Sequence, residues 1–181
     1  MMARTDATTF PKDKTLDEVS GTFQPPLYNA RIISTYLRLI QKSYSHINVN
    51  DLLDAAGMEV HQVEDEGHWF TQDQVDRFHK RLIKLTGNEE IAREAGRFAM
   101  APEMSGLLRQ YVLGFIGPAK VYDIFCILTP GFTKSSTWET KKVGRAKVEI
   151  SVTVKPGVHE QPYQCQNRMG YIEAVAETFN L

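Results

Sequence analysis

The sequence contains few cysteines and almost no excess of either charge. Cys126 and Cys165 are its only two cysteines. They are too few and too far apart for a disulfide framework or a thiolate metal site, so we expect reduced thiols. The 21 basic and 22 acidic residues give a net charge of −1. A chain without an overall positive field is not held on nucleic acid or an anionic bilayer, so we expect no nucleic-acid partner.

Long apolar runs are also missing. No stretch approaches the ~20 apolar residues that a membrane helix needs, and residues 1–11 lack the apolar core of a secretory signal. We therefore expect no membrane insertion and a cytoplasmic location. Residues 1–26 are polar and broken by prolines, which indicates a flexible leader. The remaining 27–181 suit one domain, because 42% hydrophobic and 24% charged residues are ordinary globular proportions.

Apolar residues at helical spacing predict about six helices in the first two thirds of the chain. Thr71 and Gln74 form a capping box at the start of the third helix, and Gly57 and Gly87 are placed to stop the second and third. The sixth is apolar almost all round, so we expect it to be the most deeply buried. The predicted helices cover residues 27–45, 50–57, 71–87, 88–99, 102–115 and 119–128.

The pattern changes after Gly131. Residues 137–143 and 148–154 alternate with a period of two around Gly144 and are rich in β-branched side chains, which predicts an antiparallel β-hairpin. Residues 163–179 return to helical spacing. We therefore predict an α+β fold with a mainly helical N-terminal part, a hairpin or small sheet, and a C-terminal helix packed back on it.

No catalytic constellation is recognisable. The five histidines show no spacing that would place two on one helix face for a metal. The chain has no G-x-S-x-G nucleophile motif and no glycine-rich phosphate loop. We therefore expect neither an enzyme nor a metal site in this segment.

Aromatic side chains are concentrated on the predicted core faces. They allow two interpretations: ordinary core packing, or an apolar ligand pocket between the helices and the hairpin. Cys126 has apolar neighbours and is expected to be a buried, inert thiol, with a nucleophile or haem ligand as the alternative. The candidate ligand-binding residues are Trp69, Phe98, Tyr111, Phe115, Tyr122, Cys126 and Trp138.

Three strings resemble the N-terminal sensory input domain of bacterial two-component sensor histidine kinases. They run from Trp69 to His79, from Leu108 to Phe115 and from Asn167 to Ala174, and the resemblance covers about Leu27 to Leu181. It implies a signalling role, with occupancy of a ligand site passed to an output domain.

The order of elements is also similar to the haem nitric-oxide/oxygen-binding domain and to the vinyl-reductase-like regulatory domain. The haem family takes its iron ligand from a histidine on the helix corresponding to 119–128, but this chain has no histidine between Lys80 and Val158. Its propionate-binding Tyr-x-Ser-x-Arg motif is nearest to the string from Tyr163 to Arg168, which has Cys165 in place of serine. We therefore predict no cofactor, and keep haem as an alternative.

The leading hypothesis is a sensory input domain that binds a small apolar or aromatic molecule. It implies a small-molecule ligand, an output signalling domain and a homodimer as partners. Two alternatives stay open: a structural or dimerisation module without ligand, and a haem- or metal-binding gas or redox sensor.

Overall fold

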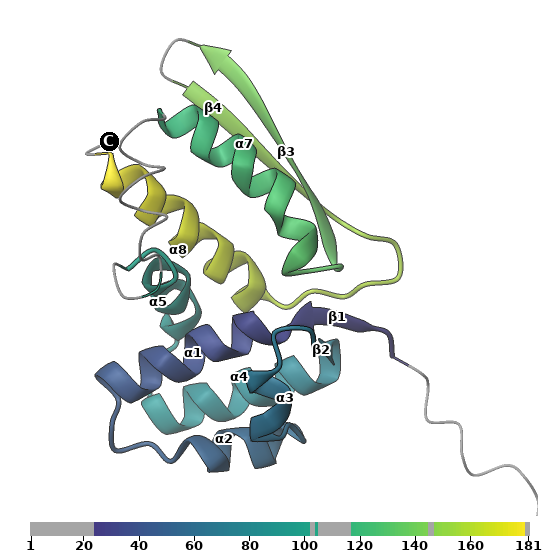
Figure 1. Ribbon diagram of the computed structural model, residues 1–181, viewed down its shortest axis with the longest axis vertical. Helices are drawn as coiled ribbons and strands as arrows, with labels where there is room; N and C mark the ends of the chain where they lie inside the picture. The colour runs from purple at the N-terminus through teal and green to yellow at the C-terminus, as the bar shows by residue number, and fades with distance from the viewer. Residues whose placement is uncertain (1–23, 102–103, 105–116, 145–146, 180–181) are drawn as a thin grey trace, which may run out of the picture.

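The predicted α+β fold is confirmed by a computed structural model, which describes residues 24–101, 104, 117–144 and 147–179 (Figure 1). The predicted helix at 102–115 lies outside the described residues except for Met104. The described elements are β1 (Pro26–Asn29), α1 (Ala30–Ser43), α2 (Val49–Ala56), α3 (Val60–Glu64), β2 (Trp69–Thr71), α4 (Gln72–Thr86), α5 (Ile91–Phe98), α7 (Pro118–Leu128), η1 (Thr129–Gly131), β3 (Ser136–Gly144), β4 (Lys147–Val154) and α8 (Pro162–Thr178).

The described elements form two lobes, each with its own hydrophobic cluster. The N-terminal lobe, β1 to α5, surrounds a large core whose fully buried side chains include Ile33, Leu52 and Phe70. The C-terminal lobe, η1 with α7, the hairpin and α8, has a smaller cluster around Val121 and Val175. In Figure 1 the C-terminal lobe lies above the N-terminal lobe, with α5 and α8 side by side. The space between the lobes contains the candidate site.

The predicted helix ends are confirmed where the signal is local. Thr71 and Gln74 form the capping box of α4. Gly57 and Gly87 end α2 and α4 in the left-handed conformation, each with φ of 63°, which a residue without Cβ adopts at little cost. The fourth helix begins at Ile91, slightly after the predicted start.

The start of α1 differs from the prediction. Residues 26–29 form β1, which pairs with β2 in antiparallel fashion, so the helix begins at Ala30 rather than at Leu27. The buried Asn29 caps it by accepting from the Arg31 amide, and its own amide group donates to the Glu66 and His68 carbonyls. The sequence pattern missed this strand pair because strands of four and three residues are too short to show alternation.

The hairpin is confirmed, but the expected deep burial of the 119–128 helix is wrong. β3 pairs with β4 from Ser136–Val154 to Gly144–Lys147, and α7 lies against it in Figure 1. On α7 Val121 is 5% exposed, whereas Ile127 is 72% exposed. A helix that is apolar on every side still buries only the sides that neighbouring elements cover.

Helices α5 and α8 touch through their backbones. A Cβ atom added to Gly96 would lie 2.0 Å from the Asn167 carbonyl oxygen, and one added to Gly170 would lie 2.0 Å from the Arg93 carbonyl oxygen. Ion pairs flank this crossing, among them Arg93 with Glu173. The two glycines therefore allow α8 to approach the N-terminal lobe closely.

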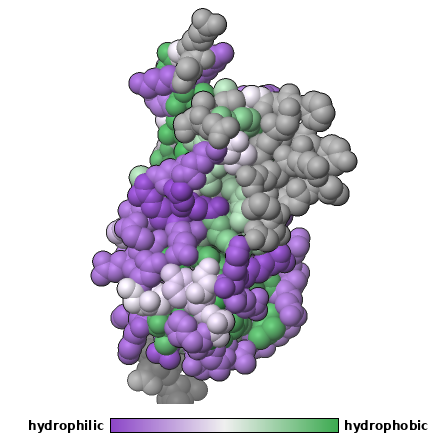
Figure 2. Space-filling view, turned by 90° about the vertical axis from the view of Figure 1, so that its left-hand side faces the viewer, coloured by the Kyte–Doolittle hydropathy of each residue, from purple (hydrophilic) through white to green (hydrophobic). Residues whose placement is uncertain are grey.

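The surface is mixed in character. On the face shown in Figure 2, hydrophilic residues cover much of the described surface and hydrophobic residues show in smaller groups between them. None of the helices in the described ranges combines the length and apolar character that crossing a membrane would require.

Candidate functional site: a cavity between the lobes

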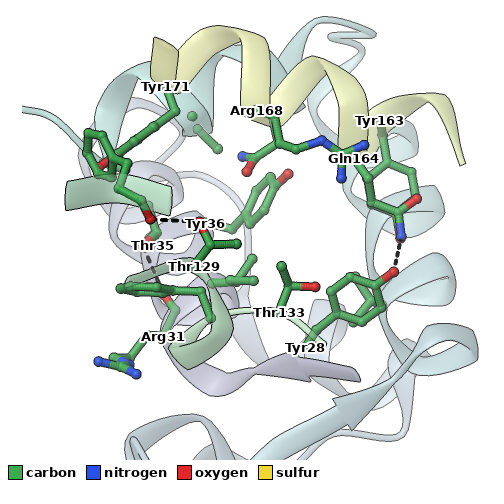
Figure 3. Close-up of a pocket in the computed structure, with 18 of the residues that line it drawn as sticks. Tyr28, Arg31, Thr35, Tyr36, Thr129, Thr133, Tyr163, Gln164, Arg168 and Tyr171 are labelled. Carbon is green, nitrogen blue, oxygen red and sulfur yellow. Dashed lines mark hydrogen bonds between the residues drawn. The ribbon is translucent and has the colours of Figure 1, made fainter. Parts of the chain in front are cut away.

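A cavity of about 190 Å³ lies between the two lobes. Its wall comes from β1, α1, α4 and α5 on one side and from α7, η1, β3 and α8 on the other (Figure 3). The lining residues are Tyr28, Arg31, Ile32, Thr35, Tyr36, Val75, Ala95, Gly96, Ala99, Phe125, Leu128, Thr129, Phe132, Thr133, Trp138, Tyr163, Gln164, Asn167, Arg168 and Tyr171.

Most of the wall is apolar or aromatic. Ile32 of α1, Phe125 of α7 and Trp138 of β3 contribute side chains without charge. Phe125 and Tyr171 meet edge to face, with ring centroids 4.0 Å apart and an interplanar angle of 77°. Such a wall favours an apolar or aromatic occupant, because it offers dispersion contacts and little compensation for a lost hydration shell.

One end of the cavity is polar, and its tyrosines are neutral. The Tyr28 hydroxyl donates to Gln72 and accepts from Gln164 Nε2 at 2.7 Å. The Tyr163 hydroxyl donates to Asp76 Oδ1 at 2.7 Å. Burial raises the pKa of Tyr28 to about 12, and burial together with Asp76 raises the pKa of Tyr163 further. Both hydroxyls therefore stay protonated and hold the polar end in a fixed arrangement.

An ion pair balances the charge of Arg168, one of the two arginines in the described wall. Arg168 donates from Nη1 to Glu160 Oε1 at 3.0 Å and from Nη2 to Glu160 Oε2 at 2.6 Å. The two side chains are 16% and 6% exposed, and the Ser135 hydroxyl also donates to Glu160. Arg168 lines the cavity, whereas Glu160 is not among the lining residues. The guanidinium therefore faces the cavity with its charge already balanced.

The η1 side of the wall is tied to the N-terminal lobe by Arg31. Its Nη2 donates to the Gly131 carbonyl at 2.7 Å, its Nε donates to Asn29 Oδ1 at 2.9 Å, and its guanidinium lies 4.5 Å from the centre of the Phe132 ring. Leu128 and Phe132 line the cavity yet are 48% and 38% exposed. These two side chains therefore border both the cavity and the solvent.

His79 lies behind the polar end. Its ring stacks on Tyr163, with centroids 4.0 Å apart and planes 14° from parallel. The side chain is buried, its Nε2 has no hydrogen-bond partner among the described residues, and burial lowers its pKa to about 4. His79 is therefore neutral at physiological pH.

The structure brings one predicted ligand residue, Trp138, to the cavity. Four others are not among the lining residues. The Trp69 ring lies under the Lys134 ammonium group, and Phe98 packs on the N-terminal core. The Tyr122 hydroxyl donates to the Ile172 carbonyl, and Cys126 is half-exposed on α7, where mainly burial raises the pKa of its thiol. Tyr111 and Phe115 lie outside the described residues.

The sequence patterns missed the polar end. Tyr28 and Gln164 are 136 residues apart, and Tyr163 and Asp76 are 87 residues apart. Pairings at such separations leave no periodic or motif signal. The one local hint was the string from Tyr163 to Arg168, which supplies three lining residues besides Asn167.

No family model matches the chain, and no curated protein matches it. Two solved structures share its fold. One comes from a study of haem distortion in the H-NOX family, with a TM-score of 0.59, 18% identity, and coverage of 84% of this chain and 81% of that chain. The other comes from a study of haem redox potential and protein-induced porphyrin distortion, with a TM-score of 0.58, 20% identity, and coverage of 84% and 85%. The fold similarity to the haem nitric-oxide/oxygen-binding domain is therefore confirmed; neither structure bears on a histidine-kinase context.

The wall of the cavity does not fit haem. Among the described lining residues there is no histidine, cysteine or methionine to bind the iron, and residues 102–103, 105–116 and 145–146 contain none of these three types either. The lining tyrosines are poor candidates for a tyrosinate ligand, because burial raises the pKa of Tyr163 and Tyr171. Arg168, which could pair with a propionate, is already paired with Glu160.

Proposed function

We propose that this chain is a non-enzymatic sensory module that takes a small apolar or aromatic molecule into the cavity between its lobes. The observation that carries the proposal is the cavity itself, which both lobes build and which has an aromatic wall and one ordered polar end. Concave, mostly apolar sites with a few placed polar groups are typical of small-molecule binding.

The volume limits the ligand. An engineered apolar cavity of about 150 Å³ in another protein binds benzene. The cavity here measures about 190 Å³. It therefore has room for one aromatic ring with a small substituent, and the polar end would meet that substituent.

Signal transmission is assigned to α8. This helix supplies Tyr163, Gln164, Asn167, Arg168 and Tyr171 to the wall and also crosses α5 in backbone contact. A ligand that binds one packing of α8 better than another shifts the equilibrium between them. The output partner we propose is a bacterial histidine kinase in the cytoplasm, on the strength of the sequence strings described above.

A haem-based gas sensor is the second candidate. The fold likeness to structures from haem studies favours it, whereas the missing axial ligand in the described wall and the paired Arg168 count against it. A colourless purified protein without a Soret band would remove this candidate.

A dimerisation module that binds no ligand is the third candidate, and it predicts that no probe enters the cavity.

Phenol and indole are suitable probes, and two matched variants test the site. Thr35 of α1 and Thr86 of α4 are both half-buried helix threonines whose hydroxyls donate to the carbonyl four residues earlier at 2.9 Å. Only Thr35 is among the residues that line the cavity. Phenol at a hundredfold excess over its Kd should raise the melting temperature by roughly 5–10 °C. Thr35→Phe should abolish that shift by filling the cavity, and Thr86→Phe should keep it.

The measurement is ligand-induced thermal stabilisation, with heats of binding from calorimetry. Equal shifts in Thr35→Phe and Thr86→Phe would place the probe elsewhere and contradict the proposed site. No stabilisation of the wild-type chain by either probe would contradict binding of a single-ring ligand.

A further inference from the structure

We infer that the cavity selects uncharged molecules, and that the Glu160–Arg168 ion pair enforces this selection. The inference rests on the proposed function, since it specifies the class of ligand for the same cavity. It begins from the only charged groups in the described wall, Arg31 and Arg168.

Arg31 contributes little charge to the cavity. Figure 3 shows its guanidinium directed away from the centre of the lining residues. Two of its donors bond to Asn29 and Gly131, and the guanidinium carbon lies 4.5 Å from the centre of the Phe132 ring. The charge that a ligand meets is therefore that of Arg168, which extends beside Gln164 in the same view.

Arg168 is neutralised before a ligand arrives. Glu160 holds it through two hydrogen bonds and is itself 6% exposed, with Ser135 donating to the same carboxylate. An anionic ligand would have to separate this pair or lie next to the Glu160 carboxylate, and both cost free energy in a site with a mostly apolar wall. A cationic ligand would be repelled by Arg168, and the apolar wall would not replace its hydration shell. A neutral ligand avoids both costs and can still accept a hydrogen bond from Arg168, whose guanidinium has donors beyond the two that Glu160 takes.

The Glu160–Arg168 pair therefore sets the charge preference of the cavity, and one substitution in the pair should change that preference. Glu160→Gln removes the negative charge but keeps an acceptor for Ser135. Arg168 then presents an unbalanced charge to the cavity, and an aromatic carboxylate becomes a matching ligand. Charge-assisted hydrogen bonds of this kind correspond to a gain of about 10- to 100-fold in affinity.

The test compares three single-ring probes at neutral pH: phenol, benzoate and benzylammonium. Calorimetry on the wild-type chain should detect phenol and neither ion. Glu160→Gln should gain about 10- to 100-fold in benzoate affinity. The matched control is Glu173→Gln, which removes a carboxylate that pairs with Arg93 and Arg97 and is not among the residues that line the cavity. Benzoate affinity should not change in this control.

The outcomes separate the inference from the proposed function. Benzoate binding to the wild type as tightly as phenol overturns the inference and leaves ligand binding intact, as does a folded Glu160→Gln variant without a gain. If Glu160→Gln binds benzoate but phenol does not bind the wild type, the proposed single-ring function fails and the role of the ion pair stands. Failure of all probes with both proteins overturns both. Should Glu160→Gln not fold, the ranking of the three probes on the wild type decides the inference.

Discussion

At the scale of single residues, His79 is a buried base with an unmet hydrogen-bonding group. Its Nε2 has no partner within the described part of the chain, and the stacked Tyr163 ring covers one of its faces. A histidine in such a position can be protonated only at a cost, and its pKa falls from 6.5 to about 4 because of burial. Protonation then favours the unfolded chain, in which the imidazole is hydrated.

The lower pKa of His79 in the folded chain predicts that the protein loses stability in acid. The folded-state pKa lies below the unfolded value, so the stabilisation is fully present above about pH 6.5 and is lost as the pH falls toward about 4. Linkage gives a loss of about 2 kcal/mol in the free energy of unfolding between pH 7 and pH 5. His79→Phe keeps an aromatic ring against Tyr163 and should remove that part of the pH dependence.

Urea unfolding at several pH values measures the free energy of unfolding of wild type and variant. The difference between the two removes the contribution of the carboxylates that both proteins share. His46 is exposed and serves as a control. His46→Phe keeps the buried His79 imidazole, so the pH dependence that His79 causes should remain. Parallel pH profiles for wild type and His79→Phe would refute the assignment.

The residues that could be predicted from the sequence are those whose partners are close in the chain. Thr71 and Gln74 are three residues apart and form the expected capping box. Trp138 was named as a ligand residue and lies in the wall. Tyr28 was not named, because its role depends on Gln164 at the other end of the chain. A candidate list built on aromatic character also cannot tell a ring in the wall from one that packs in the core, such as Phe98.

At the scale of elements, the crossing of α5 and α8 depends on two glycines whose helix propensity is poor. Glycine in a helix interior costs about 1 kcal/mol relative to alanine. That cost is offset here by contact, because Gly170 lies against the Arg93 backbone and Gly96 against the Asn167 backbone. The periodicity of the sequence predicted both helices but not this contact, since a glycine carries no apolar signal.

Gly170→Ala should therefore destabilise the protein, although propensity alone predicts the opposite. The added Cβ would lie 2.0 Å from the Arg93 carbonyl oxygen, so the helices must move apart. We expect a loss of about 2 kcal/mol or more in the free energy of unfolding. Gly117→Ala is the control, because Gly117 has a negative φ and a Cβ atom added there would meet no described atom within 4 Å. Gly117 is the N-cap of α7, where alanine is less favourable than glycine, so this change should cost less than about 1 kcal/mol. Chemical denaturation compares them, and a stabilised Gly170→Ala variant would show that the contact is not tight.

At the scale of the whole molecule, the described parts of the two lobes are joined by the Tyr28–Gln164 and Tyr163–Asp76 hydrogen bonds at the polar end of the cavity and by two further connections. One is the α5–α8 crossing. The other joins β1 and the start of α1 to the η1 region, where the Asn29 amide donates to the Phe132 carbonyl and the Lys134 amide donates to the Leu27 carbonyl. Arg31 reinforces the second connection. The connections lie on different sides of the wall, so weakening one should open the cavity locally without unfolding either lobe.

Arg31→Met tests that expectation, because it removes the side-chain bonds to Gly131 and Asn29 and the charge over the Phe132 ring. We expect faster hydrogen exchange at the Lys134 amide, by roughly 5- to 30-fold for a loss of about 1–2 kcal/mol. The Gly87 amide, which donates to Ile83 at the far end of the N-terminal lobe, should keep its rate. Arg77→Met is the matched control, since Arg77 is an exposed arginine of α4 whose ion pair is with Asp73 on the same helix. Equal acceleration at Lys134 and Gly87 would mean that Arg31 supports global stability, and the two lobes would then unfold as a single unit.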